Sequence, residues 1–142
     1  MMKKILVTIL ALVASGVFLG AQDNLEDVVA KLQTNRVTVD YSFKYDKVSC
    51  SGTITVQVPC YKAVGNGIEV WSDGVCRWTV DREAREVYIE AAESPEDYLN
   101  YLQGITDLSL KSVKCVPISE DISPFRFDVA ALDKDWVVTD LR

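Results

Sequence analysis

The side chains that most often carry out acid–base or nucleophilic chemistry are scarce in this sequence. It contains no histidine, which removes the commonest general base and the usual partner of a catalytic serine or cysteine. Carboxylates are plentiful, and one group of them lies close together along the chain: Asp81, Glu83, Glu86, Glu90, Glu93, Glu96 and Asp97. Their places in turns and on the polar side of alternating strands are typical of solvated surface charge. We therefore expect no catalytic residues and a protein that is not an enzyme.

Four cysteines are the next candidates for chemistry: Cys50, Cys60, Cys76 and Cys115. No two of them are closely spaced, so we expect no structural zinc site. In an exported chain four thiols allow three sets of pairs, and we expect at least one disulfide. Cys50 and Cys60 can pair only if the chain reverses between them, because ten residues of continuous strand span about 33 Å. The alternative is that the thiols stay free and pack as small apolar side chains.

The N-terminal segment predicts export. Lys3 and Lys4 precede an apolar run that begins at Ile5, which is the arrangement of a secretory signal peptide. Cleavage could follow Gly16 or Ala21, and we favour Ala21 because it leaves a polar N-terminus. Residues 1–21 are then the signal peptide, and residues 22–142 are long enough for one domain and too short for two. We expect a soluble, monomeric periplasmic protein.

The charge of the chain argues against nucleic acid as a partner. Fifteen lysines and arginines stand against 21 aspartates and glutamates, a net charge of −6. Such a surface repels phosphate backbones and anionic membranes. The glycine-rich loop that binds phosphates and the loop that binds calcium are both missing. We expect neither a cofactor nor a metal ion.

Turn signals indicate the elements that must position any site. Asn66-Gly67 and Asp73-Gly74 favour two-residue hairpin turns, and a third turn is predicted at Asp81–Ala84. The segments between them are short and rich in valine, isoleucine, tryptophan, threonine and tyrosine. Three successive hairpins predict an antiparallel meander.

Alternating residues predict two earlier strands, each with one buried and one wet face. Over Val37–Phe43 the apolar face carries Val37, Val39, Tyr41 and Phe43. Over Val48–Val58 it carries Cys50, Gly52, Ile54, Val56 and Val58. Further strands are predicted at Leu108–Val116, Phe125–Val129 and Trp136–Leu141.

Two amphipathic helices are predicted to cover the apolar face. The first spans Leu25–Leu32, and the second spans Ser94–Ile105 after a capping serine and Pro95. Their apolar stripes, which would act as lids, are Leu25, Val28, Val29 and Leu32 in the first and Tyr98, Tyr101 and Leu102 in the second. We expect both helices to pack on the same concave side of the sheet.

Four short motifs, taken in their order, resemble one known family. Ser72-Asp73-Gly74-Val75-Cys76-Arg77-Trp78 is similar to a Ser-Asp-Gly-Lys-x-x-Trp strand–turn–strand, and the strand that ends at Pro59 is similar to Gly-x-Leu-x-Val-Lys-Arg-Pro. Phe125-Arg126-Phe127 and Val137–Arg142 are similar to closing Phe-x-Phe and Val-x-Asp-x-Arg segments. These are motifs of the LolA-like proteins, periplasmic carriers of outer-membrane lipoproteins. The resemblance implies an α+β fold, an incomplete antiparallel β-barrel (a half-barrel meander) with two helices covering its concave apolar face.

The resemblance also implies a function. It implies a non-enzymatic carrier or chaperone that binds lipoprotein acyl chains or a related lipid, with membrane-bound donor and acceptor proteins as partners. The residues expected to line the acyl chain are Ile54, Val56, Val58, Val70, Trp78, Val80, Val87 and Ile89. Carriers of the family have an arginine just before the proline, where it holds the helical lid closed. Val58 stands there in this chain.

A second interpretation is an exported binding module whose core is filled by its own helices. Such a module would recognise a protein or glycan partner at its rim. The aromatic residues fit both interpretations, because as a set they could line a pocket or simply pack: Tyr41, Phe43, Trp71, Trp78, Tyr88, Phe125, Phe127 and Trp136. A residue that lines a cavity and one that packs a core look the same in a sequence.

Overall fold

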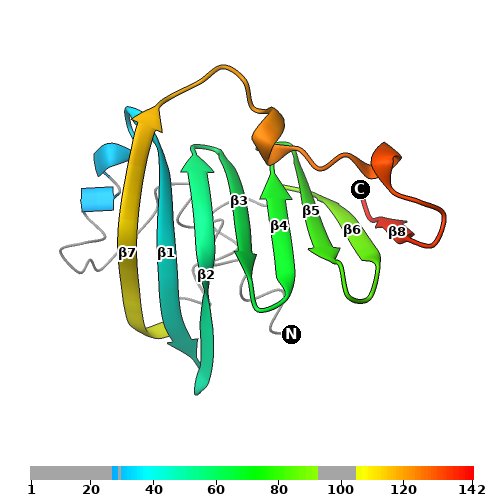
Figure 1. The fold of residues 1–142 in the computed structure, drawn as a ribbon, viewed down its shortest axis with the longest axis horizontal. Helices are drawn as coiled ribbons and strands as arrows, with labels where there is room; N and C mark the ends of the chain where they lie inside the picture. The colour runs from blue at the N-terminus through cyan, green and yellow to red at the C-terminus, as the bar shows by residue number, and fades with distance from the viewer. Residues whose placement is uncertain (1–26, 29, 93–104) are drawn as a thin grey trace.

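One open β-sheet forms most of the part of the protein that the structure describes (Figure 1). The computed structural model describes residues 27, 28, 30–92 and 105–142. The strands are β1 (Asn35–Tyr45), β2 (Val48–Gln57), β3 (Cys60–Gly65), β4 (Ile68–Ser72), β5 (Cys76–Asp81), β6 (Glu86–Ala91), β7 (Ile105–Pro117) and β8 (Val137–Asp140). Two 3-10 helices, η2 (Ser123–Phe125) and η3 (Val129–Ala131), lie between β7 and β8.

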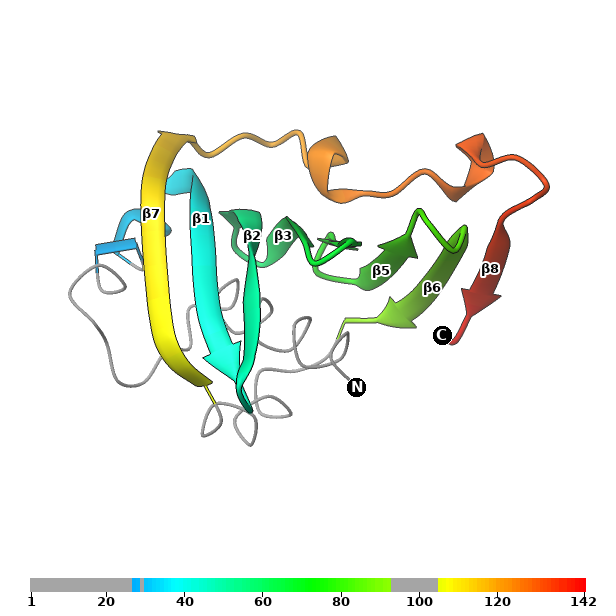
Figure 2. The ribbon, with the colours of Figure 1, turned by 60° about the horizontal axis from the view of Figure 1, so that its bottom comes forward.

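The sheet is a meander with one strand added at each edge. Its order is β7-β1-β2-β3-β4-β5-β6-β8, and every neighbouring pair is antiparallel except β6 and β8, which are parallel. Asn66 and Gly67 have φ values of 52° and 76°, which confirms the predicted hairpin turn with two positive φ angles. The direction of the strands changes steadily from β7 to β8, as in any twisted sheet (Figure 2).

The expected half-barrel with two covering helices is wrong. The sheet is mixed and not closed, and its edges are β7 and β8. Within the described residues, the only helical structure besides the two 3-10 helices is a turn near residues 27–31, where Leu32 N donates to Val28 O at 3.1 Å. Of the two expected stripes, Val28 and Leu32 are described, and both are buried against the sheet. Leu25, Val29, Tyr98, Tyr101 and Leu102 lie outside the described residues, and Ile105 begins a strand.

Two of the three later strands are confirmed, and one is wrong. The predicted strands at Leu108–Val116 and Trp136–Leu141 correspond to β7 and β8. The alternation over Phe125–Val129 does not form a strand. Pro124 sits in the first turn of η2, and the Asp128 side chain accepts a hydrogen bond from Ala130 N at the start of η3. Both features favour short turns over extended pairing.

The apolar side of the sheet changes face along its width. Face 1 is the face that carries Val39, Ile54 and Val70, which pack in one core with Val28 and Leu32. Face 2 is the opposite face, where Val80, Val87 and Ile89 form a second core. The change occurs at β4, because Val70 lies on face 1 and its neighbour Trp71 lies on face 2, opposite Trp78.

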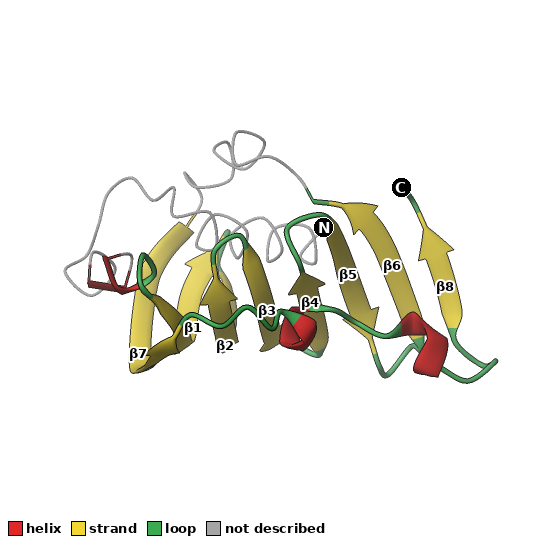
Figure 3. Cartoon of the chain, turned by 90° about the horizontal axis from the view of Figure 1, so that it is seen from above, coloured by secondary structure: helices red, strands yellow, loops and turns green. Residues whose placement is uncertain are grey.

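The connection from β7 to β8 covers face 2. We call residues 118–136 the strap. β7 ends at the end of the sheet that carries the β2–β3 and β4–β5 turns, whereas β8 begins beside Arg85 in the β5–β6 turn at the other end. The strap must therefore cross the sheet diagonally, as a crossover between two strands that run in the same direction. Figure 3 shows it running along one side of all the central strands.

Gly52 and Gly65 lie side by side on face 1 in the same row as Tyr41. An added Cβ would lie 2.7 Å from the Tyr41 hydroxyl oxygen at Gly52 and 2.6 Å from it at Gly65. The Tyr41 hydroxyl is buried and makes no hydrogen bond within the described residues. Burial raises the pKa of Tyr41 to about 12. The two glycines thus make room for the Tyr41 ring, and a Cβ at either position would also overlap a backbone oxygen of the paired strand, Val64 O at Gly52 and Ser51 O at Gly65.

We expect Gly65→Ala to lower the free energy of unfolding by about 1–3 kcal/mol, because the new methyl group overpacks the site. Adding Tyr41→Phe should recover part of this loss, since it removes the nearest side-chain oxygen. Urea denaturation of the two variants measures both effects. Ser51→Ala, at an exposed position of the neighbouring strand β2, is the control and should stay within about 0.5 kcal/mol of the parent. A Gly65→Ala variant as stable as this control would contradict the packing.

Candidate functional site

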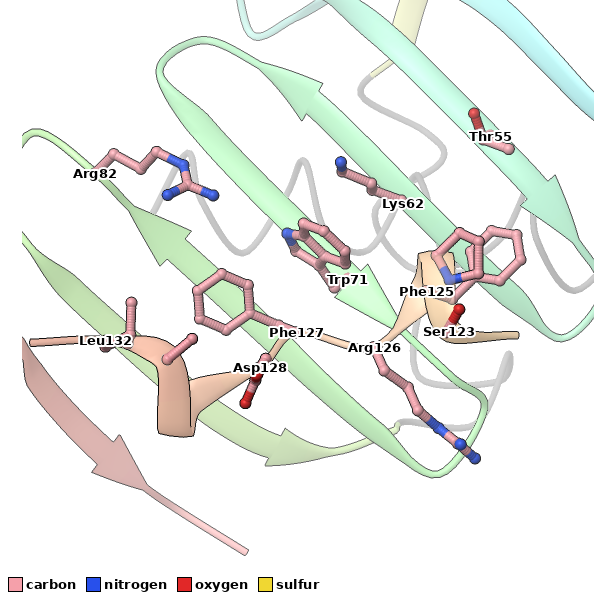
Figure 4. A pocket seen from close by; sticks show the side chains of 12 residues that line it. Thr55, Lys62, Trp71, Arg82, Ser123, Phe125, Arg126, Phe127, Asp128 and Leu132 are labelled. Atoms are coloured by element: carbon pink, nitrogen blue, oxygen red, sulfur yellow. The ribbon is translucent and has the colours of Figure 1, made fainter. Parts of the chain in front are cut away.

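A groove of about 750 Å³ lies between the strap and face 2 (Figure 4). Strands β2 to β4 and the turn after β5 form one side of it, and the strap forms the other. The lining residues are Thr55, Lys62, Trp71 and Arg82 from the sheet and Ser123, Pro124, Phe125, Arg126, Phe127, Asp128, Ala131 and Leu132 from the strap. Aromatic rings and cationic side chains thus face one space.

A row of directly paired residues forms the sheet side of the groove. Thr55 of β2 pairs with Lys62 of β3, Lys62 pairs with Trp71 of β4, and Trp71 pairs with Trp78 of β5. Side chains of directly opposed residues point to the same face of a sheet. The register therefore brings a hydroxyl, an ammonium and an indole together, although the sequence separates them by up to 16 positions.

Gln57 holds the first end of the strap. This residue is buried; its side-chain nitrogen donates to Ser119 O at 2.7 Å, and its side-chain oxygen accepts from Ser119 N at 3.1 Å. Arg36 adds two bonds, from Nε to the Gln57 oxygen at 3.0 Å and from Nη2 to Asp121 O at 2.9 Å. The Arg36 guanidinium also lies 4.9 Å from the centroid of the fully buried Phe125 ring. Each buried polar group here has a partner, as a stable attachment requires.

Asp73 holds the strap a few residues later. Its carboxylate accepts from Val75 N at 2.9 Å, from Cys76 N at 2.8 Å and from Arg126 Nε at 3.2 Å. Burial alone would raise the pKa of Asp73, but the bonds from Cys76 N, Val75 N and Arg126 together lower it below its ordinary value. The Ser-Asp-Gly motif noted in the sequence therefore has a structural role in the β4–β5 loop. This loop is longer than the predicted two-residue turn, since Ser72 pairs with Arg77.

Two of the three cations in the groove are paired with carboxylates. Arg126 binds Asp73, and Arg82 binds Glu69, with Arg82 Nη2 3.1 Å from a Glu69 oxygen. The hydrogen bond to Glu69 raises the pKa of Arg82. Glu69 also accepts a bond of 3.3 Å from the Trp71 indole nitrogen.

Lys62 differs from the two arginines. Its ammonium lies 4.0 Å from the centroid of the Trp71 ring, a cation–π contact. Within the described residues it forms no ion pair with a carboxylate. Phe127 stands on the edge of the same indole, with centroids 5.5 Å apart. Lys62 is therefore a positive charge on an aromatic surface, with no acidic partner among the residues that the structure describes.

The residues expected to line an acyl chain are not brought together. Ile54, Val56 and Val70 lie on face 1, each only 1% exposed. Trp78, Val80, Val87 and Ile89 lie on face 2 in the second core, packed with strap residues that include Val129, Leu132 and Trp136. Val58 lies outside the strands, in the turn before Pro59, and is 44% exposed. None of the eight lines the groove.

The prediction missed the cationic side chains of the groove. Of the aromatic set, Trp71, Phe125 and Phe127 do line it. Lys62 and Arg82 were overlooked although a signal for Lys62 existed. Lys62 occupies a polar position in the strand before the Asn66-Gly67 turn. The register of a hairpin with this two-residue turn places it opposite Trp71 of the next strand.

The expected disulfide is not formed: all four cysteines have free thiols. They lie on four different strands, β2, β3, β5 and β7. Cys50 pairs with Phe43 and Cys115 with Val37, so six residues of β1, or about 20 Å, separate their levels in the sheet. Cys60 and Cys76 lie on either side of β4, about 9–10 Å apart by strand spacing and beyond the reach of a disulfide. The described residues also hold no cluster of metal-binding side chains.

No protein-family model and no curated protein matches the chain. The resemblance to LolA-like proteins therefore stays a prediction. In the part of the chain that the structure describes, no helix is long and apolar enough to cross a membrane.

The lowered pKa of Asp73 predicts how the stability of the fold depends on pH. Because the folded state lowers this pKa, the charged Asp73 stabilises the fold above its ordinary pKa of about 3.9, and this contribution is lost as the pH falls through the folded value. We expect Asp73→Asn to lower the free energy of unfolding by about 1 kcal/mol at neutral pH, since the amide keeps the loop bonds but loses the charge that binds Arg126. The difference from the parent should shrink as the pH falls below about 4.

Denaturation curves at several pH values measure this difference. Asp46→Asn, in the exposed β1–β2 turn, is the matched control, and its stability should follow the parent at every pH. A loss for Asp73→Asn that stays the same from neutral to acid pH would show that the charge of Asp73 does not hold the strap.

Proposed function

We propose that the protein is an exported, non-enzymatic binding module that takes its ligand in the groove between the strap and face 2. The single observation that carries this proposal is the composition of the groove. A few cationic and hydroxyl groups converge there on an aromatic surface, which is the usual make-up of a small-ligand site. The N-terminal Lys3-Lys4 and the apolar run after them support export.

The close packing of the expected acyl-chain residues favours this module over an acyl-chain carrier. A carrier needs apolar wall that the ligand can reach, because burial of each methylene contributes only about 0.8 kcal/mol. Ile54, Val56 and Val70 are 1% exposed and packed with the chain's own Val28 and Leu32. An acyl chain would first have to displace these contacts, whereas the groove already stands open.

The bonds around the groove support a binding role rather than catalysis. A general base must be free to accept a proton from the substrate. Glu69 is held by Arg82 and Trp71, and Asp73 is held by Arg126 and two backbone N–H groups. Asp128 accepts from Ala130 N at the start of η3. The acids near the groove are thus occupied in holding the structure together.

A groove-filling variant tests the proposal. Thr55 lines the groove, while Thr53 lies two residues earlier on the same face of β2 and outside the lining. Three naphthyl probes serve as ligands: 2-naphthoate, 2-naphthylmethanol and 2-naphthylmethylammonium. We expect at least one of them to shift the indole N–H signal of Trp71 in a nuclear magnetic resonance titration. Thr55→Trp should abolish that shift, and Thr53→Trp should preserve it.

The outcomes separate the two candidate functions. If no probe shifts Trp71 in the parent protein, the groove is not a binding site and the proposal fails. If the neutral probe binds and both tryptophan variants retain it, with shifts among face 1 residues such as Ile54 and Val70, the ligand enters the first core. That result would favour the acyl-chain carrier.

A further inference from the structure

We propose that the groove selects ligands in which an oxyanion is joined to a flat apolar group, and that Lys62 is the residue that binds the anion. This inference rests on the proposed function and specifies the ligand class for the same groove. It is carried by Lys62, the one lining cation that has no acidic partner within the described residues, and by the arrangement of the aromatic rings.

Acids outside the lining neutralise two of the three groove cations, Arg82 through Glu69 and Arg126 through Asp73, which leaves Lys62 as the local positive charge. Among the lining residues, the cations Lys62, Arg82 and Arg126 face the single acid Asp128. The full chain has a net charge of −6. A lysine with no ion pair within the described residues attracts anions to its place, while the negative charge of the whole protein repels them elsewhere, which favours a specific site over general adhesion.

Lys62 is the only one of the three cations that can accept an anion without losing an ion pair within the described residues. Arg82 and Arg126 already bind Glu69 and Asp73. The contact of 4.0 Å with Trp71 positions the Lys62 ammonium, and no carboxylate of the described residues pairs with it. The residue is also half-buried, so its charge is screened less than that of a fully exposed lysine.

A hydroxyl beside Lys62 can complete the anion site. Thr55 pairs directly with Lys62, and its hydroxyl oxygen lies 3.0 Å from that of Thr38, where either atom can be the donor. When Thr38 donates, the Thr55 proton is free to bond to an oxyanion held by the ammonium. Charge-assisted bonds of this kind are about twice as strong as neutral ones.

The aromatic rings next to Lys62 specify the rest of the ligand. Trp71 and Phe127 meet edge to face, and Leu132 and Ala131 of the strap extend the apolar surface. A flat ring can lie against this surface with its anion directed toward Lys62 (Figure 4). A flat cation would be repelled by the Lys62 ammonium, and a neutral ring would leave that ammonium without an anion to bind.

The three naphthyl probes, together with 2-naphthyl phosphate, test the inference. We expect 2-naphthoate or 2-naphthyl phosphate to bind about tenfold more tightly than the neutral probe, and the cationic probe to bind most weakly. The ratio of the two anionic probes shows whether a carboxylate or a phosphate is preferred. Added salt should weaken the anionic probes and leave the neutral one nearly unchanged.

Variants of Lys62 test the role of that residue. Lys62→Met keeps the length of the side chain without its charge and should weaken binding of the better anionic probe about tenfold, while binding of the neutral probe changes less than about threefold. Lys62→Arg should keep most of the affinity. Lys114→Met is the control, because Lys114 lies in the same row on the same face but three strands away, outside the groove. The melting temperature of each variant shows that it remains folded.

Two results would overturn the inference without touching the proposed function. One is a neutral or cationic probe that binds at least as tightly as both anionic ones, in a manner that Thr55→Trp blocks. The other is a folded Lys62→Met variant with unchanged affinity for the anionic probes. If Thr55→Trp blocks none of the four probes, the proposed function itself fails.

Discussion

Val70 and Trp71 are neighbours in β4, and because successive side chains of a strand point to opposite faces, the sheet must bury apolar surface on both of its sides. Val70 belongs to the core of β1 to β4 on face 1, and Trp71 belongs to the core of β4 to β6 on face 2. A single covering layer cannot protect both. The strap covers face 2. Its residues Phe127, Val129 and Leu132 pack over strands that would otherwise expose their valines and tryptophans to water.

The strap can cover face 2 only if its first half is held by something other than apolar contact. Over β1 to β3 face 2 is polar, with Thr38, Thr55 and Lys62 in one row. Gln57 and Arg36 supply hydrogen bonds at the start of this crossing, and Asp73 supplies an ion pair where the strap reaches β4. These polar attachments are directional and therefore determine the register of the strap, whereas the apolar second half supplies most of the buried area.

Much of the sheet could be predicted from the sequence. The largest error of the prediction, which concerned the faces of the strands after β4, could have been avoided. The alternation over Val37–Phe43 and the Asn66-Gly67 turn define β1, β3 and β4 because each local preference agrees with the pairing it must make. The expectation that all the acyl-chain residues lie on one face was wrong. An even number of residues separates paired positions across the β4–β5 loop, so Trp78 lies opposite Trp71, on the face away from Val70. The strap was beyond prediction: its Phe125-Arg126-Phe127 alternation is typical of a strand, and only distant partners such as Gln57 and Asp73 hold it as a crossing segment.

The groove follows from the same change of face. A diagonal strap passes from the polar half of face 2 to the apolar half, and it can pack closely only over the second. Between the bonds at Gln57 and the contact of Phe127 with Trp71, it spans Thr55 and Lys62 without an apolar surface to rest on. A space therefore remains at the boundary, with a lysine on one side and aromatic rings on the other. Lys62 forms no ion pair within the described residues, so the fold does not use its charge to hold the strap, and that charge stays available to a ligand that enters this space.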